Sequence, residues 1–201
     1  LPLAAQETRG VIIELKASER RDAPVVERVQ LYPRSYALVI GNDDYQDPFW
    51  VKLSNGVRDA REVAAALEAK GFDVTLRQNL DGDALEEALE SFFYERGLDF
   101  DARLFVWYAG HGHTEAGEGY LVPVDAPDPD DAATFRRRAL SLRRMGEYAR
   151  GANAHHILAV FDSCFAGTVF EVQRDAPPAA ITHATTRPFR QFITSGDAGQ
   201  T

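Results

Sequence analysis

The sequence predicts an α/β fold in which a mostly parallel central sheet is flanked by helices, giving three layers. From Ser35 onward, short apolar runs alternate with amphipathic helical patterns, which is the order of crossover units in a parallel sheet. Several of these runs end in Gly-rich polar loops, as strands do at a sheet edge. With 201 residues, 45% of them hydrophobic, the chain is long enough for one domain with its own core and a short appendage.

The first 34 residues differ from the rest and are expected to form an extended or hairpin lead-in to a domain at 35–201. Residues 11–15 and 25–32 are short β-prone runs around a charged turn at 19–22. No helical periodicity connects them to the repeating pattern that follows.

The remaining elements are expected in a regular order. Residues 36–41 (YALVIG) form a buried strand, and 57–70 form a helix that stops before Gly71. Asp81 is placed to cap a second helix that ends near Gly97. We then expect a strand at 72–76 between those helices, strands at 103–108, 156–161 and 191–194, a small hairpin at 119–124, and a basic helix near 141–150.

Charge and composition exclude several classes of protein. The 31 acidic and 22 basic residues give a net charge of −9, which disfavours nucleic acid and anionic membranes as partners and favours a basic substrate. No apolar run approaches the ~20 residues that cross a bilayer. The chain starts at Leu1 without Met, so we expect a processed or shortened soluble product. An export signal can have been removed, so cytoplasmic and exported locations both stay open.

Two strand ends carry residues that suit nucleophilic catalysis. His111 follows the 103–108 strand, and Cys164 follows the 156–161 strand. Ligands of open parallel sheets gather at the carboxyl ends of the strands. A thiol with a pKa near ~8.5 needs a neighbouring imidazole to become a thiolate at neutral pH, which His111 can supply. The backbone N–H groups of Gly112 and Cys164 are expected to form an oxyanion hole.

His111 and Cys164 also allow other interpretations. The single cysteine cannot form an intrachain disulfide, and a cysteine at the end of an apolar strand is often a buried small hydrophobe. A zinc site made of His111, His113, Asp162 and Cys164 lacks the usual CxxC or HxxxH ligand spacing. The joint placement of His111 and Cys164 at two strand ends favours catalysis.

Four short motifs occur in the order and spacing of the caspase-like cysteine peptidases: YALVIG at 36–41, NGVRDA at 55–60, WYAGHG at 107–112 and FDSCFAG at 161–167. From Ser35 to Thr201 the chain resembles bacterial metacaspase-type and orthocaspase-type members most. The resemblance implies a caspase–hemoglobinase fold with His111 as general base and Cys164 as nucleophile. It leaves His113 as a loop residue without a catalytic role.

The same resemblance implies the substrate class. Metacaspases and paracaspases hold Arg or Lys with acidic residues, and the matching positions here are Asp59 and Asp162. A guanidinium between two carboxylates forms paired charge-assisted hydrogen bonds, so Arg is expected over Lys. Asp59 also suits a helix N-terminus, where the macrodipole favours an acid, and Asp162 also suits a loop-orienting role. Two departures from the family pattern, Ala109 for Ser and Phe165 for His, leave the dyad unchanged.

The family fold continues past the point that corresponds to Thr201, so we expect this chain to be a large-subunit portion. Its expected partners are a substrate with a basic residue before the cleaved bond and a small-subunit fragment of the same precursor. Residues 168–188 match the intersubunit loop, where Arg174 is the expected self-cleavage site. The run at 136–138 (RRR) is a second candidate and also reads as a solvated face.

The implied peptidase chemistry needs no cofactor. The acidic residues Asp125, Asp128, Asp130 and Asp131 offer oxygens for a loose calcium site, but they lack the periodicity of an EF-hand. The sequence therefore predicts a cysteine endopeptidase that cleaves after basic residues. The alternative is a non-catalytic caspase-like scaffold or regulatory module, which would not require both His111 and Cys164.

Overall fold

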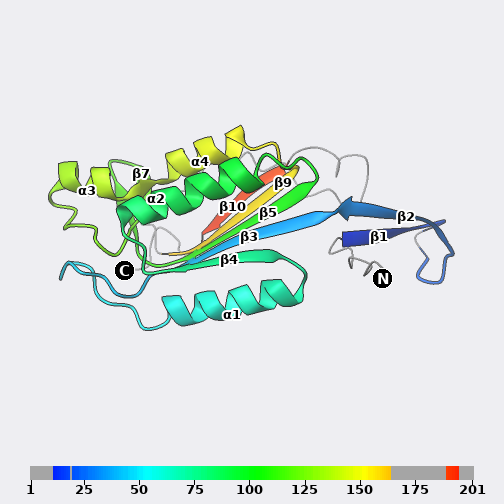
Figure 1. Ribbon diagram of the computed structural model, residues 1–201, viewed down its shortest axis with the longest axis horizontal. Helices are drawn as coiled ribbons and strands as arrows, with labels where there is room; N and C mark the ends of the chain where they lie inside the picture. The colour runs from blue at the N-terminus through cyan, green and yellow to red at the C-terminus, as the bar shows by residue number, and fades with distance from the viewer. Residues whose placement is uncertain (1–10, 19, 164–188, 195–201) are drawn as a thin grey trace, which may run out of the picture.

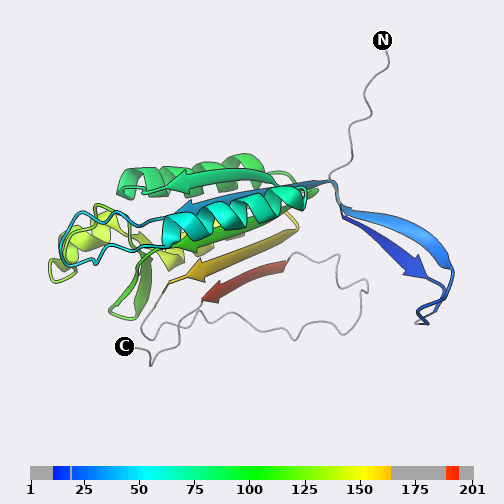
Figure 2. The same cartoon turned by 90° about the horizontal axis from the view of Figure 1, so that it is seen from below.

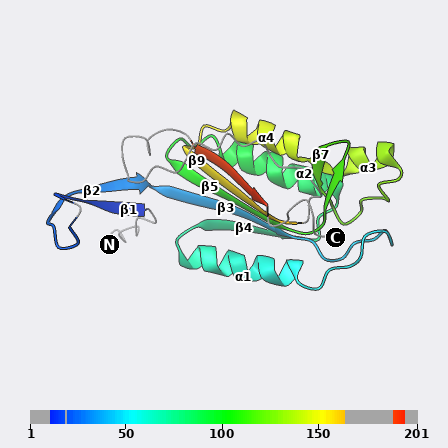
Figure 3. The same cartoon turned by 180° about the vertical axis from the view of Figure 1, so that it is seen from behind.

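A five-stranded sheet forms the centre of the fold in the computed structural model, which describes residues 11–18, 20–163 and 189–194 (Figure 1). Its strand order is β10-β9-β5-β3-β4, and all four pairings are parallel. Figure 3 shows β10 beside β9 at the edge opposite β4. The strands are β3 (Arg34–Gly41), β4 (Asp73–Gln78), β5 (Ala102–Ala109), β9 (His156–Asp162) and β10 (Phe189–Thr194).

Helices cover both faces of this sheet. One face carries α1 (Gly56–Ala69), and the other carries α2 (Gly82–Ser91) and α4 (Leu142–Gly151) (Figure 1). The predicted α/β fold with a mostly parallel sheet and three layers is therefore confirmed. No helix in the described ranges is both long enough and apolar enough to span a bilayer.

Alternation along the strands builds a separate core on each face, because successive strand side chains point to opposite sides. Leu38 and Val106 pack toward α2 and α4, whereas Val39 and Trp107 pack toward α1. On the α1 side, the small residues Ala60 and Ala64 let the helix lie close to the sheet. Burial on both faces explains why the strands read as continuous apolar runs in the sequence.

Residues 11–32 form an antiparallel hairpin of β1 (Val11–Lys16) and β2 (Val25–Tyr32). The hairpin projects from the amino end of β3, away from the helices (Figure 2). At its base, the Tyr32 hydroxyl lies 2.7 Å from Nδ1 of His156, the first residue of β9.

Helix α2 begins and ends as its sequence suggests, with one irregularity. The Asp81 carboxylate accepts a hydrogen bond from the Ala84 N–H at 2.9 Å, which confirms the predicted cap. After Ser91 the chain widens into a π-helical turn, η1 (Phe92–Arg96), that ends at Gly97. Ser141 caps α4 in the same way, accepting from the Arg144 N–H at 3.2 Å.

The chain between β5 and α4 differs from the prediction. The expected hairpin at 119–124 instead pairs β6 (Gly112–Glu115) with β7 (Glu118–Leu121), and β8 (Leu140–Ser141) joins them. The reversal falls at Ala116 and Gly117, which both have positive φ, 50° and 82°. His113 thus lies in a strand, so the interpretation of it as a loop residue was wrong.

A short helix in this region was not predicted. Helix α3 (Ala132–Arg138) follows the acidic stretch, where the sequence suggested only a loop. It forms because Asp131 caps its first turn, accepting from the Thr134 N–H, and because Phe135 is fully buried. It carries the arginine run at 136–138 in its last turn.

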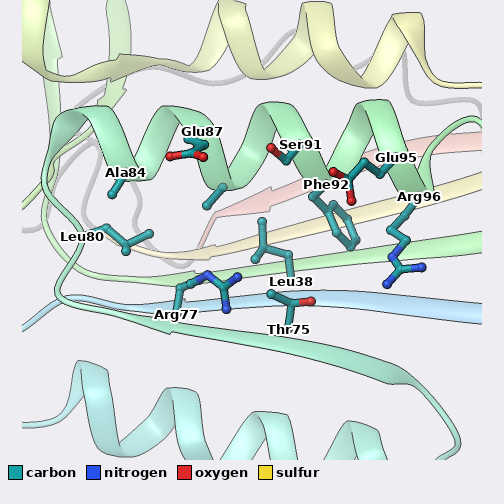
Figure 4. Close-up of a pocket in the computed structure, with 11 residues that line it drawn as sticks. Leu38, Thr75, Arg77, Leu80, Ala84, Glu87, Ser91, Phe92, Glu95 and Arg96 are labelled. Atoms are coloured by element: carbon teal, nitrogen blue, oxygen red, sulfur yellow. The ribbon is translucent and has the colours of Figure 1, made fainter.

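A pocket of about 400 Å³ opens between α2 and η1 on one side and the β3 and β4 strands on the other (Figure 4). Its lining combines the small side chains of Thr75, Ala84, Ala88 and Ser91 with the charged ones of Arg77, Glu87, Glu95 and Arg96. None of the described residues predicted to act in catalysis or substrate binding lines it.

Candidate active site

The register of β5 and β9 aligns the two loops that follow them. Ala109 of β5 pairs with Asp162 of β9, so Gly110 and Ser163 are the first residues beyond the paired strands. The Ser163 hydroxyl, 4% exposed, donates a hydrogen bond to the Gly110 carbonyl at 2.8 Å. The two loops are thus bonded directly at their starting points. Cys164 is the next residue in sequence and lies outside the described residues, as does Arg174.

The His111 imidazole is held by a backbone carbonyl. Its Nε2 lies 2.7 Å from the carbonyl oxygen of Val51, in the loop between β3 and α1. A carbonyl can only accept, so Nε2 carries the hydrogen of the neutral ring. The lone pair is then on Nδ1, which leaves Nδ1 as the basic nitrogen of His111.

Aromatic side chains of the same loop pack around His111. The Tyr45 ring centroid lies 4.5 Å from that of His111, and the Trp50 centroid lies 5.5 Å away. The Tyr45 hydroxyl accepts the His111 backbone N–H at 2.6 Å. Burial raises the pKa of Tyr45 to about 12, so the hydroxyl is neutral at physiological pH. Both the ring and the backbone of His111 are therefore fixed.

Close packing explains the glycine before His111. A Cβ on Gly110 would lie 2.7 Å from the hydroxyls of both Tyr45 and Tyr108, so only glycine fits. The Tyr108 hydroxyl donates to the Val122 carbonyl at 2.7 Å and lies 3.1 Å from the His111 carbonyl. The Val122 N–H also donates to the His111 carbonyl, at 3.1 Å.

Gly112 begins β6 directly after His111 and pairs with Leu121 of β7. It is half-buried at the same edge of the sheet. The other group predicted for the oxyanion hole, the Cys164 N–H, lies outside the described residues, so this role of Gly112 stays a prediction.

The two acids predicted to bind a basic side chain lie on β9, which ends at this edge of the sheet, and on α1, which begins there. Asp162 is the exposed last residue of β9, and Asp59 is half-buried in the first turn of α1. Helix α1 starts close to the sheet, since a Cβ on Gly41 would lie 2.5 Å from the Gly56 carbonyl oxygen. The Asp59 carboxylate accepts hydrogen bonds from the Arg58 guanidinium at 3.2 and 3.3 Å. No described contact joins Asp59 to Asp162 or His111.

The acidic stretch after β7 is largely engaged within the protein. Asp125 accepts from the Gly82 N–H at 2.8 Å and from Nε of Arg138 at 2.6 Å. Asp131 caps α3. In the described ranges no group of three or more His, Cys, Asp or Glu side chains is arranged to hold a metal ion.

His113 lies in an aromatic cluster. Its ring centroid lies 5.8 Å from that of Trp50 and 5.1 Å from that of Phe135. Burial lowers its pKa, which favours the neutral form.

Four residues of the site were not predicted from the sequence. Tyr45 and Trp50 pack against His111, Val51 holds it, and Ser163 ties the two loops. Val51 acts through its backbone, which leaves no signal in the residue type. The polar Ser163 between an apolar strand and the cysteine was the one available sign, because a buried hydroxyl needs a hydrogen-bond partner.

A parallel α/β sheet whose adjacent strands lead into a His-Gly loop and a Ser-Cys loop defines a domain of the cysteine-peptidase type. The chain belongs to the caspase domain family, whose family model matches residues 34–194. This confirms the resemblance to caspase-like cysteine peptidases drawn from the motifs.

Similar proteins agree with this assignment. The human mucosa-associated lymphoid tissue lymphoma translocation protein 1 is 33% identical over 93 residues, and its mouse homologue has the same identity over the same length. These matches cover 46% of this chain and 11% of each relative. The crystal structure of protein GSU0716 from Geobacter sulfurreducens superposes with a TM-score of 0.50 at 20% identity, covering 78% of this chain and 60% of that one. At that identity the likeness supports the fold alone.

Proposed function

We propose that this chain is a cysteine endopeptidase of the metacaspase or orthocaspase type that cleaves after a basic residue, with Arg preferred over Lys. The observation that carries the proposal is the hydrogen bond from Ser163 to Gly110, at 2.8 Å. Those residues directly precede Cys164 and His111, and consecutive Cα atoms are only about 3.8 Å apart. The bond aligns the residues that directly precede the dyad, and this supports the proposal that His111 and Cys164 act together.

In the proposed reaction, Nδ1 of His111 takes the proton of the Cys164 thiol, and the thiolate attacks the scissile carbonyl carbon. The N–H groups of Gly112 and Cys164 stabilise the oxyanion. The C–N bond breaks as His111 gives its proton to the leaving amine, leaving a thioester. Water, deprotonated by His111, then hydrolyses the thioester and restores the thiol. Every proton transfer runs through His111, and backbone N–H groups stabilise the oxyanion, so the proposed reaction needs no cofactor.

Asp59 and Asp162 are proposed to select the basic side chain. Asp59 accepts hydrogen bonds from the guanidinium of its neighbour Arg58, the group that an arginine substrate also carries, and this supports the proposed role. A substrate guanidinium would displace Arg58 or share the carboxylate with it. A lysine ammonium lacks the planar fork and forms fewer paired bonds.

Hydrolysis of short fluorogenic peptides that end in Arg, Lys or Asp tests this function, with Cys164→Ala as the blank. We expect Arg turnover above Lys turnover, none with Asp, and at least about tenfold lower kcat/KM for Arg in Asp162→Asn, since a charge-assisted pair is lost. Turnover of the Asp peptide would contradict the acidic pocket. Absence of turnover with all three peptides would contradict the peptidase assignment and favour the scaffold.

We also propose that the enzyme processes itself after Arg174, ten residues beyond Cys164 in sequence. In the second candidate run, at 136–138, Arg136 forms an ion pair with Glu115, and Arg138 forms one with Asp125. Sequencing of fragment N-termini should find a new terminus at Asp175 in the active chain and not in Cys164→Ala. An active preparation whose chain stays intact, or is cleaved only at other positions, would refute Arg174 as the site.

A further inference from the structure

Two large apolar side chains face solvent on either side of Trp50, in the loop between β3 and α1. Trp50 is 6% exposed, and its Nε1 donates to the Pro127 carbonyl at 3.1 Å. Its neighbours Phe49 and Val51 are 47% and 72% exposed. The buried indole fixes the loop, so the two flanking side chains are presented outward.

The loop is fixed at further points, so the exposed pair has a defined position. The Gln46 N–H donates to the Val124 carbonyl at 2.8 Å, and the Phe49 N–H donates to the Asp47 carboxylate at 2.9 Å. Apolar surface that is already held in place binds a ligand at a lower entropic cost than a mobile loop does.

This apolar pair lies near the proposed general base, His111: Val51 contacts it directly, and Phe49 is linked to it through Trp50. The carbonyl of Val51 itself bonds Nε2 of His111 at 2.7 Å. The Phe49 ring lies 4.9 Å from the Trp50 ring, whose centroid in turn lies 5.5 Å from that of His111. Single exposed apolar residues are common on protein surfaces, but two that flank one buried tryptophan beside a catalytic candidate can meet the same ligand side chain.

The chemistry indicates which part of a substrate meets this surface. The imidazole that protonates the leaving amine must lie on the leaving-group side of the scissile bond. Residues packed beside His111 are therefore close to the first residue of the departing peptide. Asp59 and Asp162, by contrast, are proposed to bind the side chain of the residue before the scissile bond.

We propose that Phe49 and Val51 form an apolar wall that selects a large apolar side chain directly after the scissile bond. This inference rests on the proposed function and adds a second specificity element to it: cleavage between a basic and an apolar residue. The selectivity is moderate, because the wall is open to solvent and buries only part of the side chain.

Partitioning of the acyl-enzyme measures this selectivity directly. A benzyloxycarbonyl-Leu-Arg aminomethylcoumarin substrate acylates Cys164 and releases the coumarin amine. Leucinamide and glycinamide then compete with water for the thioester: the amine nitrogen attacks, His111 takes its proton, and the C–S bond breaks to regenerate the thiol. The ratio of the two peptide products reports selectivity on the leaving-group side, independent of the acylation rate.

We expect the chain to favour leucinamide over glycinamide about tenfold, since one apolar side chain against a protein surface gives discrimination of this order. In Phe49→Ser with Val51→Ser, the preference should fall to about twofold or less. The Val51 backbone carbonyl, and with it the bond to His111, is retained. Phe100→Ser is the matched control, since Phe100 is 58% exposed and precedes β5 at the opposite edge of the sheet, and it should keep the full preference.

The outcomes separate the two proposals. Coumarin release in the chain and not in Cys164→Ala, followed by equal use of both amides, would overturn the wall and leave the peptidase standing. Loss of the preference in Phe100→Ser would also overturn it, because the effect would not be local. Absence of coumarin release would overturn the proposed function and the wall with it.

Discussion

The Ser163 hydroxyl donates a hydrogen bond to the Gly110 carbonyl at 2.8 Å, across the carboxyl ends of two adjacent parallel strands. Neither residue belongs to the proposed dyad, yet each directly precedes one of its members. Parallel pairing alone sets which residues lie side by side up to Ala109 and Asp162, where the ladder ends. The Ser163 bond extends that alignment by one residue into the loops, where the chemistry is proposed to occur.

Replacement of the Ser163 hydroxyl should lower activity by more than the accompanying loss of stability explains. In Ser163→Ala, the buried Gly110 carbonyl loses its partner, which costs about 1–3 kcal/mol of unfolding free energy. Because the loops are then less well aligned, we expect kcat/KM for an Arg peptide to fall about tenfold. Urea unfolding and initial-rate measurements give the two values.

Ser35→Ala is the matched control for this variant. Ser35 is equally buried, at 5% exposure, but it accepts from Nε of Arg103 at the amino end of the sheet. We expect a similar loss of stability and unchanged kcat/KM. If both variants lose activity in proportion to stability, the bond from Ser163 to Gly110 has no specific role in the site.

The glycine before His111 should be intolerant of a methyl group. A Cβ at Gly110 would lie 2.7 Å from two tyrosine hydroxyls, so Gly110→Ala must displace the Tyr45 and Tyr108 side chains. We expect a loss of about 1–3 kcal/mol of unfolding free energy and a large loss of activity, since Tyr45 holds the His111 backbone. Thermal unfolding and kinetics measure both.

Gly146→Ala tests whether the effect is local. Gly146 lies inside α4, and its nearest contact would be the flexible end of Arg150 at 3.3 Å. Alanine there should stabilise the chain by about 0.5–1 kcal/mol through its helix propensity and leave activity unchanged. Normal activity in Gly110→Ala would mean that the packing around His111 does not matter for function.

The way each element is buried decides whether it could be predicted from the sequence. The parallel strands and α1 were predictable because burial on both faces leaves long apolar runs, and Asp81 was a recognisable cap. Helix α3 was missed because seven residues, with only Phe135 buried, carry too little periodicity. Tyr45 and Val51 reach His111 from 66 and 60 residues away, and no local pattern encodes such contacts.

The reactivity of Cys164 tests the proposed base without any substrate. A thiol activated by His111 should alkylate with iodoacetamide well below pH 8, whereas in His111→Gln the rate should rise only near the ordinary thiol pKa of about 8.5. His113→Gln is the control: burial lowers the pKa of His113, and its ring faces aromatic side chains, so the profile should stay as in the parent chain. A shifted pH profile in His113→Gln, or an unshifted one in His111→Gln, would mean that His111 is not the base.

Chelation should leave the proposed activity unchanged. Asp125, the first acid of the stretch considered for calcium, already binds Arg138 and the Gly82 N–H. A calcium ion would have to displace a charge-assisted pair to gain that ligand. Assays in EDTA and in millimolar calcium should agree within about twofold, because calcium takes six to eight oxygen ligands and Asp125 is already paired with Arg138. Strong activation by calcium, lost in Asp128→Asn with Asp130→Asn, would establish the site that we do not expect.

Stability should decline as the pH falls from 7.5 to 5, and histidines should be the cause. Burial lowers the pKa of His156, helped by the nearby positive charges of His155 and Arg190, and burial likewise lowers that of His113. The unfolded chain, with ordinary histidine values near ~6.5, then binds more protons than the folded chain below that pH, so protonation favours unfolding. The hydrogen bond to Arg34 lowers the pKa of Asp99 from its ordinary value of 3.8, so Asp99 affects stability only near and below that value, outside the range from pH 7.5 to 5. In urea unfolding, the unfolding free energy of His156→Gln should therefore decline less steeply between pH 7.5 and 5 than that of the parent chain. The double variant with His113→Gln should show a smaller decline still. An unchanged slope in both variants would mean that the burial of these two rings does not cause the pH dependence.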